Sequence, residues 1–477
     1  MESIWSQLCR IKEREPLKGE IKTDVAVIGA GMAGILTAFE LQKAGIRVVV
    51  LDAGKIAGGQ TKNTTAKITA QHGMIYEKLI QTMGREKAAQ YSMANQQAVR
   101  AFEELITEEA IDCDFEEKSA YLYGESAGKL QKEAEAAASL GLPAAFVRDV
   151  PLPVPAAGAV KFEHQAQFNP LKFIKKVSEQ LTVFENTPVR TVEEHILHAG
   201  FGSIKAEKIV FACHFPFINF PGMYFARMHQ ERSYVLALKN AAQMEGMFIG
   251  AEENSFSFRN YNDLLLLGGG SHRTGENRTG GRYDELRQKA REWYPQCEEV
   301  ACWSAQDCIT PDSVPYIGRY AAGSPDWFVA TGFQKWGMTS SMAAAFLLRD
   351  MISGKKHPYE EVFDPGRFEV EMVPGVAAEG GHAVKGLVKR IFQIPSEAAE
   401  NIPAGHGGVV LLNGEKCGVY KDRDGRLHAV DIRCPHLGCQ LEWNPDEHSW
   451  DCPCHGSRFD YLGNLISGPA QENLKNE

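Results

Sequence analysis

Residues 24–53, DVAVIGAGMAGILTAFELQKAGIRVVVLDA, change their local pattern twice. A β-branched run from Val25 to Ile28 ends in glycines, an alanine-rich amphipathic segment follows, and a second apolar run from Val48 to Leu51 ends at Asp52. This order predicts a strand, a helix and a second, parallel strand. The chain is therefore expected to begin with the βαβ unit of an α/β domain.

The turn inside this unit is Gly29-Ala30-Gly31-Met32-Ala33-Gly34, which fits G-x-G-x-x-G. Glycines at these positions let the backbone turn tightly and approach a pyrophosphate, which the free N–H groups of the helix then bind. Asp52, at the end of the second strand, is placed to accept a hydrogen bond from a ribose hydroxyl. The pattern predicts a dinucleotide site; the alternative is a tight turn that binds nothing.

The residues after Asp52 favour FAD over NAD. The stretch AGKIAGGQTKNTTAKITAQHG, which includes Thr61 and Thr65, is polar and rich in Gly and Thr, as expected for a segment that wraps a pyrophosphate and a ring. A second glycine zone offers further backbone approaches at Gly318, Gly332 and Gly337. We find no second strand–GxGxxG–helix unit and no C-x-x-x-x-C beside the site, so a small organic substrate is the expected electron source.

The N-terminal glycine motif, TPDSVPYIG and ATGFQKWGMTSS together resemble the FAD-dependent D-amino-acid oxidase/glycine oxidase superfamily over about residues 22–355. The resemblance implies an FAD-binding Rossmann-like domain with a β-rich substrate domain. It also implies that the late glycine segment packs over the flavin, through Gly332, Phe333, Trp336, Gly337 and Met338. The resemblance also places Thr310 and Asp312 near the flavin, although a turn-capping role explains Asp312 equally well.

The resemblance also implies that the middle of the chain forms a sheet over the flavin on the substrate side, and SYVLALKN and LLLLGGGSHRTG look like its strands. In this interpretation Arg273 binds a carboxylate, His272 takes a proton and Tyr234 projects towards the ring. The alternative is that these are ordinary polar loop residues, and the same alternative applies to Lys67, His72 and Lys335. In relatives a histidine sometimes tethers the flavin covalently, but the spacing does not establish this for His72.

The stretch CPHLGCQLEWNPDEHSWDCPCHGS, residues 434–457, contains two short ligand pairs, Cys434-x-His436 and Cys452-x-x-His455. Two thiolates and two imidazoles from two loops are the ligand set of a two-iron cluster with mixed ligation, whose neutral imidazoles raise the reduction potential. A structural zinc site is the alternative, since Cys2His2 also suits zinc. His448 is expected to bind no metal.

CPHLGC, CPCHGS and the later SGPAQENL resemble a Rieske [2Fe–2S] domain over about residues 398–477. The resemblance implies an all-β domain, a disulfide between Cys439 and Cys454, and Ser457 as a hydrogen-bond donor to a cluster sulfur. Phe459 stands where high-potential members carry tyrosine, so we expect a lower potential, which redox titration of Phe459→Tyr would test by a rise. The resemblance also implies that the histidine edge of the cluster faces solvent.

The predicted organisation is an FAD-dependent oxidoreductase over residues 1–365, a linker over 366–397 and a Rieske domain over 398–477. Within the first part, nucleotide-binding segments are expected near 22–110 and 305–355 and the substrate sheet mainly over 115–305. The net charge of −10 argues against a nucleic-acid partner. No run of eighteen apolar residues and no secretory leader is found, so a cytoplasmic protein without a membrane span is expected.

A flavin takes two electrons from a substrate, whereas a two-iron cluster takes one at a time. The combination predicts an enzyme that oxidises a small amine or amino-acid-like substrate at FAD and passes electrons singly to a separate electron-transfer protein. One alternative is a carrier or redox sensor without catalysis. Another is a Rieske oxygenase, which needs a further iron held by two histidines and a carboxylate; we find no convincing set, and His195 and His198 are expected at an edge or turn.

Overall fold

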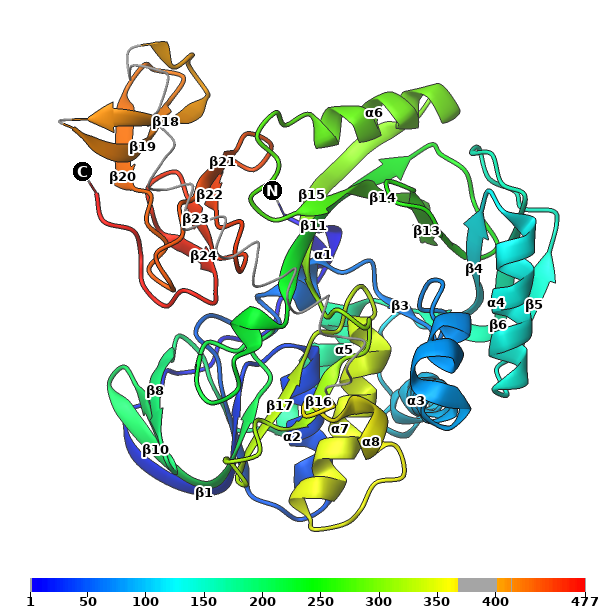
Figure 1. Ribbon diagram of the computed structural model, residues 1–477, viewed down its shortest axis with the longest axis horizontal. Coiled ribbons are helices and arrows are strands. Elements are labelled where there is room, and N and C mark those ends of the chain that lie inside the picture. Colours follow the sequence, from blue (N-terminus) through cyan, green and yellow to red (C-terminus); the bar gives the residue numbers. More distant parts are fainter. Residues whose placement is uncertain (1, 368–400, 413, 477) are drawn as a thin grey trace.

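The computed structural model describes residues 2–367, 401–412 and 414–476, and the fold is given for these residues. The chain forms two large sheets with helices around them, and a smaller β-rich part lies against one side (Figure 1). The predicted linker over 366–397 falls almost wholly outside the described residues, so its boundaries stay a prediction.

The first sheet is the nucleotide-binding one. Strand β1 (Gly19–Ile28) pairs in parallel with β2 (Val48–Leu51) on one side and β10 (Gly202–Phe211) on the other. The sheet order is β16-β17-β10-β1-β2-β7, with β8 and β9 attached through β10. Its other strands are β7 (Val183–Phe184), β8 (Val189–Glu193), β9 (Ile196–Ala199), β16 (Tyr316–Arg319) and β17 (Trp327–Thr331).

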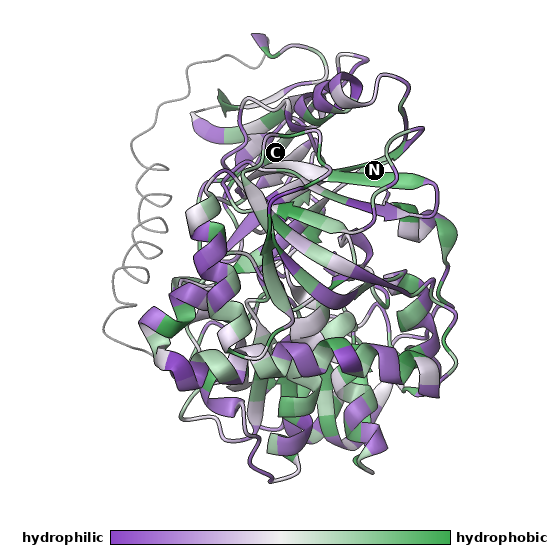
Figure 2. Cartoon of the chain, turned by 90° about the vertical axis from the view of Figure 1, so that its right-hand side faces the viewer, coloured by the Kyte–Doolittle hydropathy of each residue, from purple (hydrophilic) through white to green (hydrophobic). Residues whose placement is uncertain are grey.

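Helices cover this sheet because its central strands are apolar on both faces. All four residues of β2 are buried, and ten residues of helix α2 (Met32–Lys43) are buried as well. Helix α7 (Gly337–Ile352) packs beside α2. Figure 2 shows green, apolar strands in the lower part of the molecule behind helices that carry purple residues. The remaining helices are α1 (Ile4–Leu8), α3 (Tyr76–Glu108), α4 (Ala127–Ser139), α5 (Pro170–Val177), α6 (Arg282–Trp293) and α8 (Glu360–Phe363).

The second sheet has the order β15-β11-β14-β13-β12-β4-β6-β3, with β5 paired to β6. Its first three strands, β15 (Glu298–Ile309), β11 (His229–Lys239) and β14 (Leu264–Arg273), are antiparallel neighbours. The others are β3 (Lys67–Ile68), β4 (Glu116–Gly124), β5 (Ala144–Val147), β6 (Gly158–Gln167), β12 (Met247–Gly250) and β13 (Ser257–Tyr261). Apart from β3, the strands of this sheet lie between residues 116 and 309, whereas β7 to β10 from the same range belong to the first sheet. The predicted domain bounds stay a prediction.

The described residues of the C-terminal part form two small antiparallel sheets. One consists of β18 (Gly407–Leu412), β19 (Glu415–Lys421) and β20 (Leu427–Asp431). The other consists of β21 (Glu442–Asn444), β22 (Ser449–Asp451), β23 (Arg458–Asp460) and β24 (Leu465–Ser467). In Figure 1 this part lies beside β11 and β15. Among the described residues, no helix combines the length and the apolar character that a bilayer span requires.

Candidate functional site

The glycine turn between β1 and α2 is fixed by close contacts. Gly29 has φ +108°, and a Cβ there would lie 2.5 Å from the Ala212 carbonyl oxygen. A Cβ on Gly34 would lie 1.8 Å from the Gly29 carbonyl oxygen. Gly31 is the N-cap of α2 and makes no side-chain capping bond. The turn therefore needs glycine at both ends for packing, and it directs the start of α2 towards the cavity described below.

Asp52 and Thr61 hold this turn in place. The Asp52 carboxylate accepts hydrogen bonds from the backbone N–H groups of Ala30 (2.7 Å) and Gly54 (2.8 Å). Burial raises the pKa of Asp52, and these two N–H groups oppose that shift. The Met32 N–H donates to the Thr61 hydroxyl at 3.0 Å. Asp52 thus supports the turn itself, in addition to lining the space expected for a ribose.

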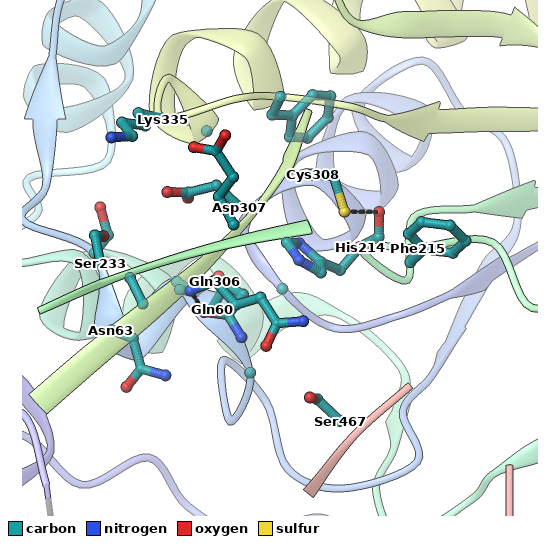
Figure 3. Close-up of a pocket in the computed structure, with 18 of the residues that line it drawn as sticks. Gln60, Asn63, His214, Phe215, Ser233, Gln306, Asp307, Cys308, Lys335 and Ser467 are labelled. Atoms are coloured by element: carbon teal, nitrogen blue, oxygen red, sulfur yellow. Dashed lines mark hydrogen bonds between the residues drawn. The ribbon is translucent and has the colours of Figure 1, made fainter. Parts of the chain in front are cut away.

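A cavity of about 1300 Å³ extends from this turn along β11, β15 and the start of α7 to residues 465–473 of the C-terminal part (Figure 3). Most of the residues that the sequence assigns to FAD and substrate line it, namely Gly29, Gly31, Asp52, Thr61, Thr65, Tyr234, His272, Arg273, Gly332, Phe333, Trp336, Gly337 and Met338. Gly34, Thr310, Asp312 and Gly318 are not among the lining residues; Gly318 packs against Pro365. The glycine cradle and the size of this cavity fit a dinucleotide.

The loop at Thr65 and Ala66 is held in place by contacts that the sequence did not reveal. Arg259 on β13 is fully buried and donates to the carbonyl oxygens of Thr65 and Ala66, the latter at 2.7 Å. Lys67 donates to the Thr65 hydroxyl at 3.2 Å. Burial, with Arg259 and Lys335 nearby, lowers the pKa of Lys67 to about 7. A buried arginine on a strand gives no local sequence signal, because its partners are backbone atoms far along the chain.

Strands β11 and β15 carry polar side chains on both faces. Paired residues of antiparallel strands point to the same side, and successive residues point to opposite sides. Glu231 pairs with Asp307, and Arg232 pairs with Gln306. We call the side of Glu231 and Asp307 the inner face and the side of Arg232 and Gln306 the outer face. Glu231, Asp307 and Gln306 all line the cavity.

The inner face is acidic, with a lysine opposite. Asp307 and Lys335 lie near each other at one end of the cavity in Figure 3. Burial raises the pKa of Asp307 to about 7, with Lys335 opposing the shift and Glu231 adding to it. The Lys335 ammonium donates to the Ser271 hydroxyl at 2.9 Å. The pair Glu231 and Asp307 escaped sequence reasoning because only the strand register brings them together.

The three residues expected to act on substrate are separated by the sheet. Tyr234 and His272 hydrogen-bond to each other (3.0 Å), and Tyr234 also accepts from Asn277 at 3.3 Å. His272 pairs with Arg232, so it shares the outer face, whereas Arg273 pairs with Glu231. Arg273 lies where the two domains meet and donates to the Pro453 carbonyl oxygen at 3.4 Å. The catalytic assignment of these residues stays a prediction.

His72 is a buried, fully bonded imidazole. Its Nδ1 lies 2.6 Å from the Tyr91 hydroxyl, and its Nε2 lies 2.8 Å from the Thr69 carbonyl oxygen. The ring stacks on Trp336 with centroids 4.9 Å apart. Burial lowers the pKa of His72 to about 3. The neutral ring therefore supports Trp336, one of the expected flavin neighbours.

The four expected cluster ligands converge between two loops of the C-terminal part. The Nδ1 atoms of His436 and His455 lie 3.2 Å apart. Two nitrogens that share one tetrahedral metal at about 2.1 Å lie about 3.4 Å apart, so the spacing fits a common metal. The Cys434 and Cys452 thiols hydrogen-bond to each other, which lowers the pKa of Cys434. Burial lowers the pKa of His436 to about 4, and the neutral form is the one that binds metal.

The expected disulfide lies beside these ligands, whereas the role of Ser457 as a donor to a cluster sulfur stays a prediction. Cys439 and Cys454 form a disulfide. Ser457 is buried, contacts the Cys434 thiol and accepts a hydrogen bond from the Ala470 N–H at 2.9 Å. Phe459 is fully buried in the same apolar cluster as Cys434 and Cys452. Because the two disulfide cysteines cannot act as thiolate ligands, two thiols and two imidazoles remain, which is the Rieske ligand set.

The expectation that the histidine edge faces solvent is wrong for this chain. The His455 side chain is only 2% exposed and lies against Phe215 and Phe225 of the N-terminal part, at 6.4 and 5.9 Å between ring centroids. His436 is half-buried, and its Nε2 lies 2.7 Å from the Asn219 amide oxygen. The cause is that the C-terminal domain packs on the outer face, which a resemblance to separate Rieske domains could not reveal.

Comparison with known proteins assigns both parts. The family "FAD dependent oxidoreductase" matches residues 24–351, and the family "Rieske [2Fe-2S] domain" matches residues 393–476. The putative Rieske 2Fe-2S iron-sulfur protein YhfW of Bacillus subtilis (strain 168) is 38% identical over 495 residues, which cover 99% of this chain and 97% of that protein.

Two solved structures share the fold of the N-terminal part. Glycine oxidase from Geobacillus kaustophilus has a TM-score of 0.62 at 20% identity, covering 73% of this chain and 99% of that one. L-proline dehydrogenase from P. horikoshii has a TM-score of 0.62 at 19% identity, covering 74% and 98%. The chain belongs to the FAD-dependent oxidoreductase family of D-amino-acid oxidase type, and it carries a Rieske domain that binds a [2Fe–2S] cluster.

Proposed function

We propose that the chain oxidises a small amine or amino-acid-like substrate at its FAD and passes the electrons singly through the Rieske cluster to a separate electron-transfer protein. One observation carries this proposal: a single cavity is walled by the dinucleotide turn, the inner face of the sheet and residues 465–473 of the Rieske domain. The two redox sites therefore adjoin one space within one chain.

The residues of the inner face suit an amine. A primary or secondary amine is protonated at neutral pH and must lose a proton before its C–H bond can be oxidised. Asp307, with its pKa raised to about 7, is poised to accept that proton, as general bases with a pKa near the working pH do. Arg273 and Lys335 are two of the basic residues along the same cavity and can pair with a substrate carboxylate.

The electron count requires an outside acceptor. Loss of one C–H and one N–H bond turns the amine into an imine and releases two electrons and two protons. When bound, FAD supplies the two-electron acceptor and the cluster the one-electron relay. Two transfers to a one-electron carrier therefore complete each substrate oxidation, and water can then hydrolyse the released imine.

Anaerobic mixing of the purified protein with a panel of amines, amino acids and hydroxy acids tests the proposal. We expect one class to bleach the flavin absorbance and to produce the EPR signal of the reduced cluster. The Cys434→Ser variant, which lacks a ligand, should still bleach but give no signal. If no compound bleaches the flavin while the cluster exchanges electrons with a carrier protein, the chain is a carrier or sensor.

An oxygenase is disfavoured by the metal-ligand geometry. Among the described residues, the group of three close His, Cys, Asp or Glu ligands is Cys439, Cys452 and Cys454, and two of these form the disulfide. No second iron site with two histidines and a carboxylate accompanies it in this part of the chain. Iron analysis above two atoms per chain would contradict this conclusion.

A further inference from the structure

The outer face of the substrate sheet is joined to the Rieske domain through one buried carboxylate. Glu447, between β21 and β22, has a side chain only 9% exposed. It pairs with Arg232 on β11, and with Arg458 on β23 at 2.7 Å. It also accepts hydrogen bonds from the hydroxyls of Ser304 (2.7 Å) and Tyr283 (3.2 Å). Three of these four partners belong to the FAD domain.

The adjacent residue forms a second anchor at the start of α6. The Asp446 carboxylate accepts from the Asn277 amide at 2.8 Å and from the backbone N–H groups of Gly281 and Arg282, both at 3.1 Å. These are the N-terminal N–H groups of a helix, which an acidic side chain caps favourably. The helix is thus capped by a residue of the other domain, more than 160 positions away along the chain.

A third contact lies at the cluster loops themselves. The Gln230 amide donates to the His455 carbonyl oxygen at 2.6 Å, and the Gln306 amide donates to the Gly456 carbonyl oxygen at 2.8 Å. Gly456 has φ +78°, and a Cβ there would lie 2.7 Å from the Gln230 side chain. The backbone beside a cluster ligand is therefore held directly against strands whose other face lines the flavin cavity.

These contacts fix the position of the Rieske domain on the FAD domain more than they strengthen the binding between the two domains. A buried ion pair often repays little more than the cost of removing its charges from water, but losing one partner leaves the others buried and uncompensated. Glu447 meets all of its partners only when the two domains dock in one register. A network of this kind selects that register against other placements of the domain.

We propose that this docked arrangement is the electron-transfer position of the Rieske domain, that Glu447 is the positioning residue that fixes it, and that electrons cross between the two domains of one chain at the contact of His455 and Gly456 with Gln230 and Gln306. The proposal rests on the proposed function, because that function gives this electron transfer its role in catalysis. It does not depend on which substrate reduces the flavin.

The first test uses the whole holoprotein and no substrate. The flavin is reduced by a light flash, and cluster reduction is followed by its visible absorbance over a wide range of protein concentrations. Transfer within one chain is first order, so we expect a rate constant that does not change on dilution. A rate that falls in proportion to concentration would show transfer between chains and would overturn the proposal. Because no substrate is used, this result is independent of a failure to find one.

The second test compares Glu447→Gln with Glu447→Asp and with Glu299→Gln. Glu447→Gln leaves Arg232 without its counter-charge beside Arg458, which keeps its ion pair with Asp451, and we expect flash-induced transfer to slow by roughly tenfold or more. Glu447→Asp keeps the charge and should recover part of the rate. Glu299→Gln, on strand β15, removes a partly exposed ion pair with Arg287 of helix α6 and should leave the rate unchanged.

Hydrogen exchange provides a readout that does not involve the cofactors. The amides of Gly281 and Arg282 are protected by Asp446, so we expect faster exchange in Glu447→Gln and unchanged exchange in Glu299→Gln. The EPR spectrum and midpoint potential of the cluster should match the wild type, since its ligands are untouched. Wild-type transfer rates together with wild-type amide protection in Glu447→Gln would overturn the role of this residue.

Discussion

The two faces of strands β11 and β15 carry equally polar side chains but differ in how these are satisfied. On the outer face, Arg232 and Gln306 are bonded to residues of the Rieske domain. On the inner face, Glu231 and Asp307 border a cavity, and Asp307 has its pKa raised to about 7 by burial. Contacts with the Rieske domain on one face and a carboxyl group with a raised pKa on the other indicate that the two faces of one sheet serve docking and substrate chemistry.

The strand sequences explain how both surfaces arise. In β11, HQERSYVLALK, the first half is polar at every position, whereas the second half is largely apolar. Because side chains alternate, a fully polar half-strand places polar groups on both sides of the sheet. Such a half-strand is stable only when both faces find partners or solvent, and here the partners are another domain and a ligand cavity.

Removal of Arg232, the cation of the outer face, should have the largest effect on stability. Arg232→Ala leaves Glu447 with part of its charge uncompensated, so we expect a loss of about 3–5 kcal/mol in the stability of the docked Rieske domain. Urea unfolding followed by the visible absorbance of the cluster measures this. The matched control, Arg287→Ala, removes the exposed partner of Glu299 and should cost less than about 1 kcal/mol. Equal effects of the two variants would contradict a special role for the outer face.

The two faces should also differ in their response to pH. Burial opposes the charge of Glu447, but Arg232 and Arg458 outweigh it and lower its pKa to about 2. The pKa of Glu447 is lower in the folded state than in the unfolded state, where it is about 4.5, so its ionisation stabilises the folded state by about 3 kcal/mol above about pH 4.5. This stabilisation is lost as the pH falls from about 4.5 to about 2. The stability difference between wild type and Glu447→Gln, measured by urea unfolding, should therefore stay constant from about pH 5 to about pH 8. A clear slope within that range would be inconsistent with a fully ionised Glu447.

On the inner face, substitution of Asp307 should affect chemistry instead of docking. As a base with a pKa of about 7, Asp307 is active when ionised, so flavin reduction by an amine should rise with pH through about 7 and then level off. Asp307→Asn should abolish that rise and lower the plateau by about 100-fold. Stopped-flow absorbance measures both, with Glu299→Gln as the control on the same strand. Retention of the pH dependence in Asp307→Asn would assign the titration to another group.

The sequence predicted those features that depend on local pattern. The unit from Val25 to Asp52 and the two cysteine–histidine pairs follow from the order and type of neighbouring residues, whereas the second sheet was expected from the family resemblance. The placement of the Rieske domain could not be predicted, because the sequence around Glu447 is typical of an exposed loop. Its partners Arg232 and Ser304 are far away in the sequence and meet it only in the folded chain. The same limit hid the pair of Glu231 and Asp307, which are distant in sequence and adjacent only through strand register.

The smallest expected effect concerns Tyr234, which the sequence places among the residues acting on substrate. Its hydroxyl hydrogen-bonds to His272 and Asn277, and it shares the outer face with Arg232. From that position, Tyr234→Phe should change flavin reduction by less than about fivefold, the equivalent of one ordinary hydrogen bond, and should lower stability by about 1 kcal/mol. Stopped-flow reduction and urea unfolding of the same preparation measure the two effects. A loss of flavin reduction as large as that expected for Asp307→Asn would instead place the Tyr234 hydroxyl at the substrate. The two faces of the sheet would then not have separate roles.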